Sequence, residues 1–225
     1  APLYPTFLAV VYFFSGTGFS RLFAARLTQV ILFGAPLAPL TYFITKHLSH
    51  LPASLNSEEE SGKRSETVAR TSAWVVACYP MLLVYPLGLG TENPFFILLL
   101  LSFTFLLKSI ERPTTFNFLL SGIFLALTAL TRSVILPFAG LAMLYLIYLH
   151  RKKALIVGVV FVLVVAPWII RNSLLHNKFT GIETSMGYNM YLGYHPLGNG
   201  SFIFGPSLDL LTIMDDAERE EVGIK

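Results

Sequence analysis

The chain has 225 residues, of which 54% are hydrophobic and only 13% are charged, and its mean hydropathy is +0.65. Soluble domains carry about 25% charged residues, so this composition excludes an ordinary soluble domain and indicates a membrane protein with several spanning helices. The net charge of +3 is too small and too scattered for a nucleic-acid surface. The one cysteine, Cys78, excludes a disulfide framework within the chain and is expected to be a buried packing residue.

Residues 1–26 are apolar but interrupted. Their longest unbroken run, from Thr6 to Phe14, is shorter than the roughly 20 apolar residues that a spanning helix needs. We therefore expect the end of a first external loop that carries an interfacial helix. Because the chain starts at Ala1 and stops at Lys225 inside a helix-like stretch, we expect both ends to continue in a longer protein.

Apolar stretches between residues 27 and 170 predict a transmembrane bundle in an all-α fold. Pro36 and Pro39 should kink the first span, because each removes an intrahelical hydrogen bond. Residues 49–70 are polar, and we expect a flexible cytoplasmic loop there. About six spans follow from the apolar stretches, namely 27–45, 71–87, 93–107, 114–131, 133–149 and 154–170.

Lysine and arginine alternate between the two sides of these predicted spans. The turn around Glu92 has none, and the short connection 131–133 contains only Arg132. The positive-inside rule therefore places the turn around Glu92, Arg132 and the region 171–225 on the external side, the last as the start of an external loop or domain. The basic residues of the opposite, cytoplasmic side are Lys46, Lys63, Arg64, Arg70, Lys108, Arg112, Arg151, Lys152 and Lys153.

Glu92 is the only charged residue between Thr71 and Leu107. It is expected in the first turn of a helix that returns into the membrane, where unpaired N–H groups favour a negative charge. Two interpretations stay open: Glu92 caps that helix, or it has a functional role, because carboxylates at membrane depth are costly and rare.

Two arginines are candidates for binding a phosphate. Arg132 follows the span 114–131 and suits a lipid-linked phosphate, although it could also reach ordinary headgroups. Arg171, with Asn172, ends the last span, where a basic residue often only anchors the helix end. Tyr85, before the turn around Glu92, is assigned to the same substrate-binding set.

The tail 185–202 interleaves tyrosines with amides and glycines. Tyr188 and Asn189 are the sugar-binding candidates here, since aromatic rings stack on sugars and amides bind hydroxyls, but a Gly-rich interfacial loop has the same composition. His195 has no second histidine at metal-ligand spacing, so we assign no metal ligand. The sequence contains no P-loop, GxGxxG, GxSxG or HExxH motif, so it does not support nucleotide chemistry.

Several segments in order resemble bacterial membrane glycosyltransferases of the GT-C superfamily, the group similar to protein O-mannosyltransferases and aminoarabinose transferases. The segments are PLYPTFLAVVY, RLTQVILFG, CYPMLLVYPLGLGTENPFFILLL, GIFLALTALTRSVILPF, APWIIRNSLLHNKF and GYNMYLGYHPLGNGSF. The resemblance covers nearly the whole chain outside residues 49–70. It implies transfer of a sugar from a polyprenyl-phosphate donor on the external face of the plasma membrane.

On this resemblance, the principal catalytic acid belongs to the first external loop. Residues 1–26 contain no Asp or Glu, so that acid would lie upstream of Ala1 or be absent. Glu92 matches a second external acidic position, where some relatives hold a divalent metal or the acceptor. Arg132 and Arg171 would fall where the donor phosphate is bound.

Two other functions remain open. One is a polytopic transporter or lipid flippase, in which Glu92 and Arg132 would line a path; the other is a non-catalytic membrane subunit. The sequence shows no internal repeat of the kind that many transporters have. The expected partners are the polyprenyl-phosphate sugar, membrane lipid and an acceptor of unknown class, with no nucleic acid.

Overall fold

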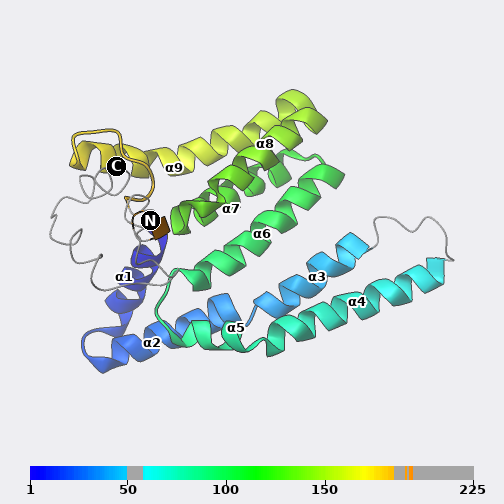
Figure 1. Cartoon of the computed structure of the whole chain (residues 1–225), viewed down its shortest axis with the longest axis horizontal. Coiled ribbons are helices and arrows are strands. Elements are labelled where there is room, and N and C mark those ends of the chain that lie inside the picture. Colours follow the sequence, from blue (N-terminus) through cyan, green and yellow to red (C-terminus); the bar gives the residue numbers. More distant parts are fainter. Residues whose placement is uncertain (50–57, 185–190, 192, 195–225) are drawn as a thin grey trace. The chain divides into compact units, whose positions relative to one another are not determined.

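A computed structural model of the chain describes residues 1–49, 58–184, 191 and 193–194 (Figure 1). The regular elements of these residues are all helices, without a strand, which confirms the predicted all-α class. The chain divides into two compact units, Pro2–Val164 and, together with Ala1, Val165–Lys225. The first unit holds the helical bundle, and the second begins within the last helix.

The amino-terminal region folds as two helices, α1 (Leu3–Ser15) and α2 (Phe19–Gln29). Gly16 and Gly18 join them with φ values of 72° and 91°, which a residue with a side chain rarely adopts. At 13 residues α1 is too short to cross a bilayer, as expected, although its predicted place at the interface stays a prediction.

The helical stretch around Pro36 and Pro39 is irregular. A π-helical turn, Val30–Gly34, lies between α2 and α3 (Leu37–Ser49), and Ala35 N–H donates to the carbonyl of Val30 at 2.8 Å. A π turn accommodates an extra residue, and such turns are a common cause of local bending. Residues Phe19–Ser49 still form one continuous stretch of 31 residues.

The prediction of a flexible loop over 49–70 is wrong from residue 58 onward, because α4 runs from Glu58 to Cys78. Its polar half packs against α3 (Figure 1): Ala69 and Ser65 are buried, and the Ser65 hydroxyl donates to the carbonyl of Lys46 at 3.1 Å. The polar composition of this segment favoured a loop, but glutamate, lysine and arginine are also good helix formers. Small residues on one face let a polar helix approach its neighbour closely.

A sharp bend follows α4. Tyr79 is extended, Pro80 starts α5 (Pro80–Val84), and the 3₁₀ turn Tyr85–Leu87 completes an arm bent by 55° from α4. The proline at the first helical position explains the break, since it cannot continue the hydrogen bonding of the preceding helix. Cys78 lies at this bend and is exposed, so its predicted burial is wrong.

The centre of the bundle is the pair α6 (Glu92–Glu111) and α7 (Thr115–Thr131). Two hydroxyl pairs, all four members buried, join these helices: Ser102 with Thr128 at 3.0 Å and Ser109 with Ser121 at 2.9 Å. Hydrogen bonds between small side chains allow close approach of helices where no water is present.

The remaining helices are α8 (Leu136–His150), which follows the 3₁₀ turn Ser133–Ile135, and α9 (Leu155–Leu175), which follows Arg151–Ala154. Leu125, Leu146 and Val157 belong to one buried apolar cluster. A Cβ atom on Gly122 would lie 2.8 Å from the carbonyl oxygen of Val157, so α7 and α9 meet at backbone distance.

Six spans are not supported. Within the described residues, three helical stretches are long and apolar enough to cross a membrane, or up to four if the bent pair 62–87 counts as one span. They are Phe19–Ser49, Glu92–Glu111 and Ser133–Leu175. The count falls because α7 has only 17 residues and because α8 and α9 belong to one stretch of 43 residues. Between 11% and 33% of each apolar window is buried, so most of this surface faces outward, as a membrane protein requires.

Candidate functional site

The helix α6 starts at Glu92, as the sequence predicts. Thr91 provides no side-chain cap, so the first N–H groups of α6 lack that partner. The carboxylate of Glu92 lies in the first turn, where the helix dipole stabilises a negative charge by roughly 0.3–1 kcal/mol.

Arg132 meets Glu92 directly. Its Nη1 atom donates to Oε1 of Glu92 at 2.6 Å, and the two side chains are 41% and 33% exposed. Arg132 follows the last residue of α7, so the cation lies at a helix C-terminus and the anion at a helix N-terminus. Both helix dipoles therefore favour the charges that the pair carries, and both charged groups remain accessible.

Gly90 packs against the other oxygen of this carboxylate. A Cβ atom on Gly90 would lie 2.5 Å from Oε2 of Glu92. A side chain at position 90 would therefore have to displace the Glu92 carboxylate. The glycine is explained by this close approach, since its backbone has no positive φ.

Gln29 holds the turn that leads to Glu92. Its side chain is fully buried, and Nε2 donates to the carbonyls of Pro86 at 2.6 Å and Gly88 at 2.7 Å. The hydroxyl of Tyr4 donates to Oε1 of Gln29 at 3.1 Å. Gln29 thus connects α1, α2 and the segment before α6 through three hydrogen bonds.

Asn93, in the first turn of α6, also binds the backbone of this turn. Its Nδ2 atom donates to the carbonyls of Gly88 at 3.1 Å and Gly90 at 3.3 Å. Its Oδ1 atom is buried and has no hydrogen-bond partner among the described residues. The two amides, Gln29 and Asn93, therefore fix the backbone of the turn on which Glu92 is mounted.

Tyr4 is also electrostatically linked to this site. Burial, together with the electrostatic effects of Tyr12 and Glu92, raises the pKa of Tyr4 to about 12. Tyr4 therefore stays protonated and remains the donor in its hydrogen bond to Gln29.

The other sequence-predicted residues have contacts of their own or lie outside the described part. Tyr85 is 37% exposed, and its ring packs edge-on against Phe96 at 5.9 Å between centroids. Arg171 and Asn172 belong to the second unit, and their predicted place beside the donor phosphate stays a prediction. Tyr188 and Asn189 lie outside the described residues.

Within the second unit, Asn172 has a structural contact. It is 6% exposed, and its Nδ2 atom donates to the carbonyl of Gly181 at 3.1 Å. The guanidinium of Arg171 lies 4.7 Å from the centre of the Trp168 ring, and Nη1 donates to Oδ1 of Asn172 at 3.3 Å. These contacts fold the end of α9 onto residues 180–182, and a role of either side chain in substrate binding stays a prediction.

In the part of the chain that the structure describes, no three His, Cys, Asp or Glu side chains gather so that they could hold a metal ion. The divalent metal expected beside Glu92 stays a prediction. At Glu92 the nearest charge is the guanidinium of Arg132, which occupies one carboxylate oxygen.

Sequence reasoning missed three members of this site: Gln29, Asn93 and Tyr4. A signal existed for Gln29, since an amide at the start of a long uncharged apolar stretch needs a partner. Its main acceptors are backbone carbonyls, which no residue type reveals.

No protein family matches this chain, and no curated protein or solved structure is significantly similar to it.

Proposed function

We propose that the chain is part of a membrane glycosyltransferase that moves a sugar from a polyprenyl-phosphate donor to an acceptor on the external face of the membrane. The observation that carries the proposal is the ion pair of Glu92 and Arg132. It joins a potential base and a potential phosphate ligand at 2.6 Å, on a turn held by buried amides, with both side chains partly exposed.

The chemistry matches these two groups. An acceptor O–H or N–H attacks the anomeric carbon, the bond between that carbon and the phosphate oxygen breaks, and the polyprenyl phosphate departs with the electron pair. Glu92 takes the proton of the acceptor, which is general base catalysis. Arg132 stabilises the negative charge on the departing phosphate through its planar set of N–H donors.

The geometry also suggests how the pair would respond to a donor. A phosphate that binds Arg132 competes with Glu92 for the same guanidinium. Glu92 would then lose its cationic partner, and its carboxylate would be free to contact the acceptor when the donor is in place. The partly exposed guanidinium supports this exchange, since a fully buried pair would be costly to break.

The test is sugar transfer by the complete protein in membranes, from a radiolabelled polyprenyl-phosphate sugar. Glu92→Gln and Arg132→Gln should each lower turnover by about 10²-fold, the lower range for a general base or an oxyanion donor. Glu111→Gln is the matched control, because Glu111 lies at the other end of α6 and pairs with His47. Unchanged turnover in the folded Glu92→Gln variant would remove Glu92 from the chemistry.

A lipid flippase is the second candidate. The π turn at Val30–Gly34 and the 55° bend after Cys78 favour it, because interrupted helices are typical of transporters. Sealed vesicles distinguish the two functions. Movement of a fluorescent polyprenyl-phosphate lipid between leaflets without any glycosylated product would support the flippase.

A further inference from the structure

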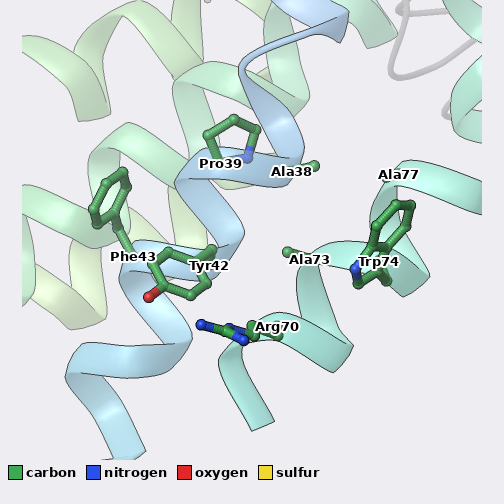
Figure 2. A pocket seen from close by; sticks show the side chains of 8 residues that line it. All are labelled: Ala38, Pro39, Tyr42, Phe43, Arg70, Ala73, Trp74 and Ala77. Carbon is green, nitrogen blue, oxygen red and sulfur yellow. The ribbon is translucent and has the colours of Figure 1, made fainter. Parts of the chain in front are cut away.

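A groove between α3 and the arm formed by α4 and α5 has no role in the proposed function. Its wider part is a pocket of about 410 Å³ between α3 and α4 (Figure 2). A second pocket of about 330 Å³ continues toward Pro86, and the two share Ala38 and Ala77 in their walls. Because they share these residues, the two pockets form one mainly apolar channel along α3.

Small residues and the bend produce this groove. Ala38 on α3 faces Ala73 and Ala77 on α4, so facing side chains do not fill the space between the helices (Figure 2). The bend at Tyr79–Pro80 turns the second arm by 55°, and side chains of that arm line the continuation of the groove.

A cationic cluster lies at one end of the groove. Glu66 is bridged by Lys46 at 2.7 Å and by Arg70 at 2.7 Å, and the hydroxyl of Tyr42 donates to both Glu66 oxygens at 3.0 and 2.9 Å. Two cations against one carboxylate leave a net charge of +1. Arg70 uses Nε for this ion pair, and its side chain is 71% exposed.

Trp74 stands beside Arg70 on the pocket wall and is 70% exposed (Figure 2). Tryptophan is enriched where the hydrocarbon of a bilayer meets its headgroups. An apolar channel that ends at a tryptophan and a +1 cluster matches a lipid with apolar tails and a singly charged phosphodiester headgroup.

We propose that this groove binds one anionic glycerophospholipid, with its phosphate at Arg70 and Lys46 and an acyl chain along Ala73 and Ala77. The occupant is a bulk membrane lipid and not the sugar donor, because Glu92 and Arg132 do not line this groove. The inference requires that the chain spans a membrane, and it is independent of the proposed transfer reaction.

Quenching of Trp74 fluorescence by brominated lipids tests the proposal. These 225 residues contain two tryptophans, so the background protein carries Trp168→Phe, and any tryptophan outside these residues is also replaced by Phe to leave Trp74 as the reporter. The protein is reconstituted in phosphatidylcholine vesicles that contain a minor fraction of brominated phosphatidylglycerol or of brominated phosphatidylcholine. The ratio of the two quenching constants measures the preference for the anionic lipid next to Trp74.

We expect a preference that falls about fivefold with Arg70→Gln, the factor that corresponds to about 1 kcal/mol for a basic residue at an anionic membrane surface. Lys46→Gln should lower it similarly. Ala73→Leu fills the groove without a change of charge and should weaken quenching by both lipids. Arg64→Gln is the matched control, because Arg64 is exposed on the same helix and does not line the pocket.

Three results would overturn the proposal. The first is a preference near one in the background protein, and the second is an equal loss of preference in Arg64→Gln and Arg70→Gln, which would indicate general surface charge. The third uses farnesyl phosphate as a competitor. If it displaces brominated phosphatidylglycerol at lower concentration than unlabelled phosphatidylglycerol does, the groove belongs to a prenyl phosphate.

Discussion

The buried amide of Gln29 should be a main determinant of the turn that carries Glu92. In Gln29→Leu, the carbonyl of Pro86 loses its donor, whereas the carbonyl of Gly88 keeps the bond from Asn93. Pro86 is buried, so its unpaired carbonyl costs about 1–3 kcal/mol, and the lost bond to Tyr4 costs about 1 kcal/mol more. The total is a loss of about 2–4 kcal/mol in the free energy of unfolding.

Denaturant unfolding in mixed micelles, followed by helical circular dichroism, measures this loss. Tyr4→Phe is the matched control, because it removes only the hydroxyl bond to Gln29 and should cost about 1 kcal/mol. Equal losses in Tyr4→Phe and Gln29→Leu would refute the reasoning, because the Pro86 carbonyl would then contribute nothing. Transfer activity should also fall in Gln29→Leu, since the backbone before Glu92 is no longer fixed.

Two further predictions concern the packing of α7. Gly122→Ala should destabilise the protein by about 1–3 kcal/mol, because the new Cβ atom would overlap the carbonyl oxygen of Val157. In the control Gly140→Ala the new Cβ atom meets nothing within 4 Å, so that variant should be neutral or stabilising. Unfolding midpoints of the two variants give the comparison, and equal effects would contradict the close approach of α7 and α9. For the buried hydroxyl pair of Ser109 and Ser121, a double-mutant cycle to alanine should give a coupling of about 0.6 kcal/mol, and a coupling of zero would mean that each hydroxyl bonds only within its own helix.

Local chemistry made part of the site predictable. Glu92 follows a turn rich in glycine and proline, and Arg132 follows a long apolar stretch, so each was expected at a helix end on the same side. The structure places them at 2.6 Å, which confirms that they lie together, while their role in transfer stays a prediction.

The missed features depend on contacts between distant residues. Gln29 acts on carbonyls that are 57 and 59 positions away, and carbonyl acceptors leave no trace in residue type. The polar half of α4 was taken for a loop because its composition resembles a disordered segment. This segment is helical because Ser65 and Ala69 are buried against α3. Composition alone does not reveal burial against a partner helix.

The exposed thiol at the end of α4 provides a native attachment point. Cys78 is the single cysteine of these 225 residues, so within them a nitroxide or fluorophore attaches at one defined place. Relaxation of that nitroxide by oxygen and by a water-soluble nickel chelate would give the depth of the α4–α5 bend in a bilayer. One label would thus tell whether this bent arm crosses the hydrocarbon or returns to the leaflet from which it came.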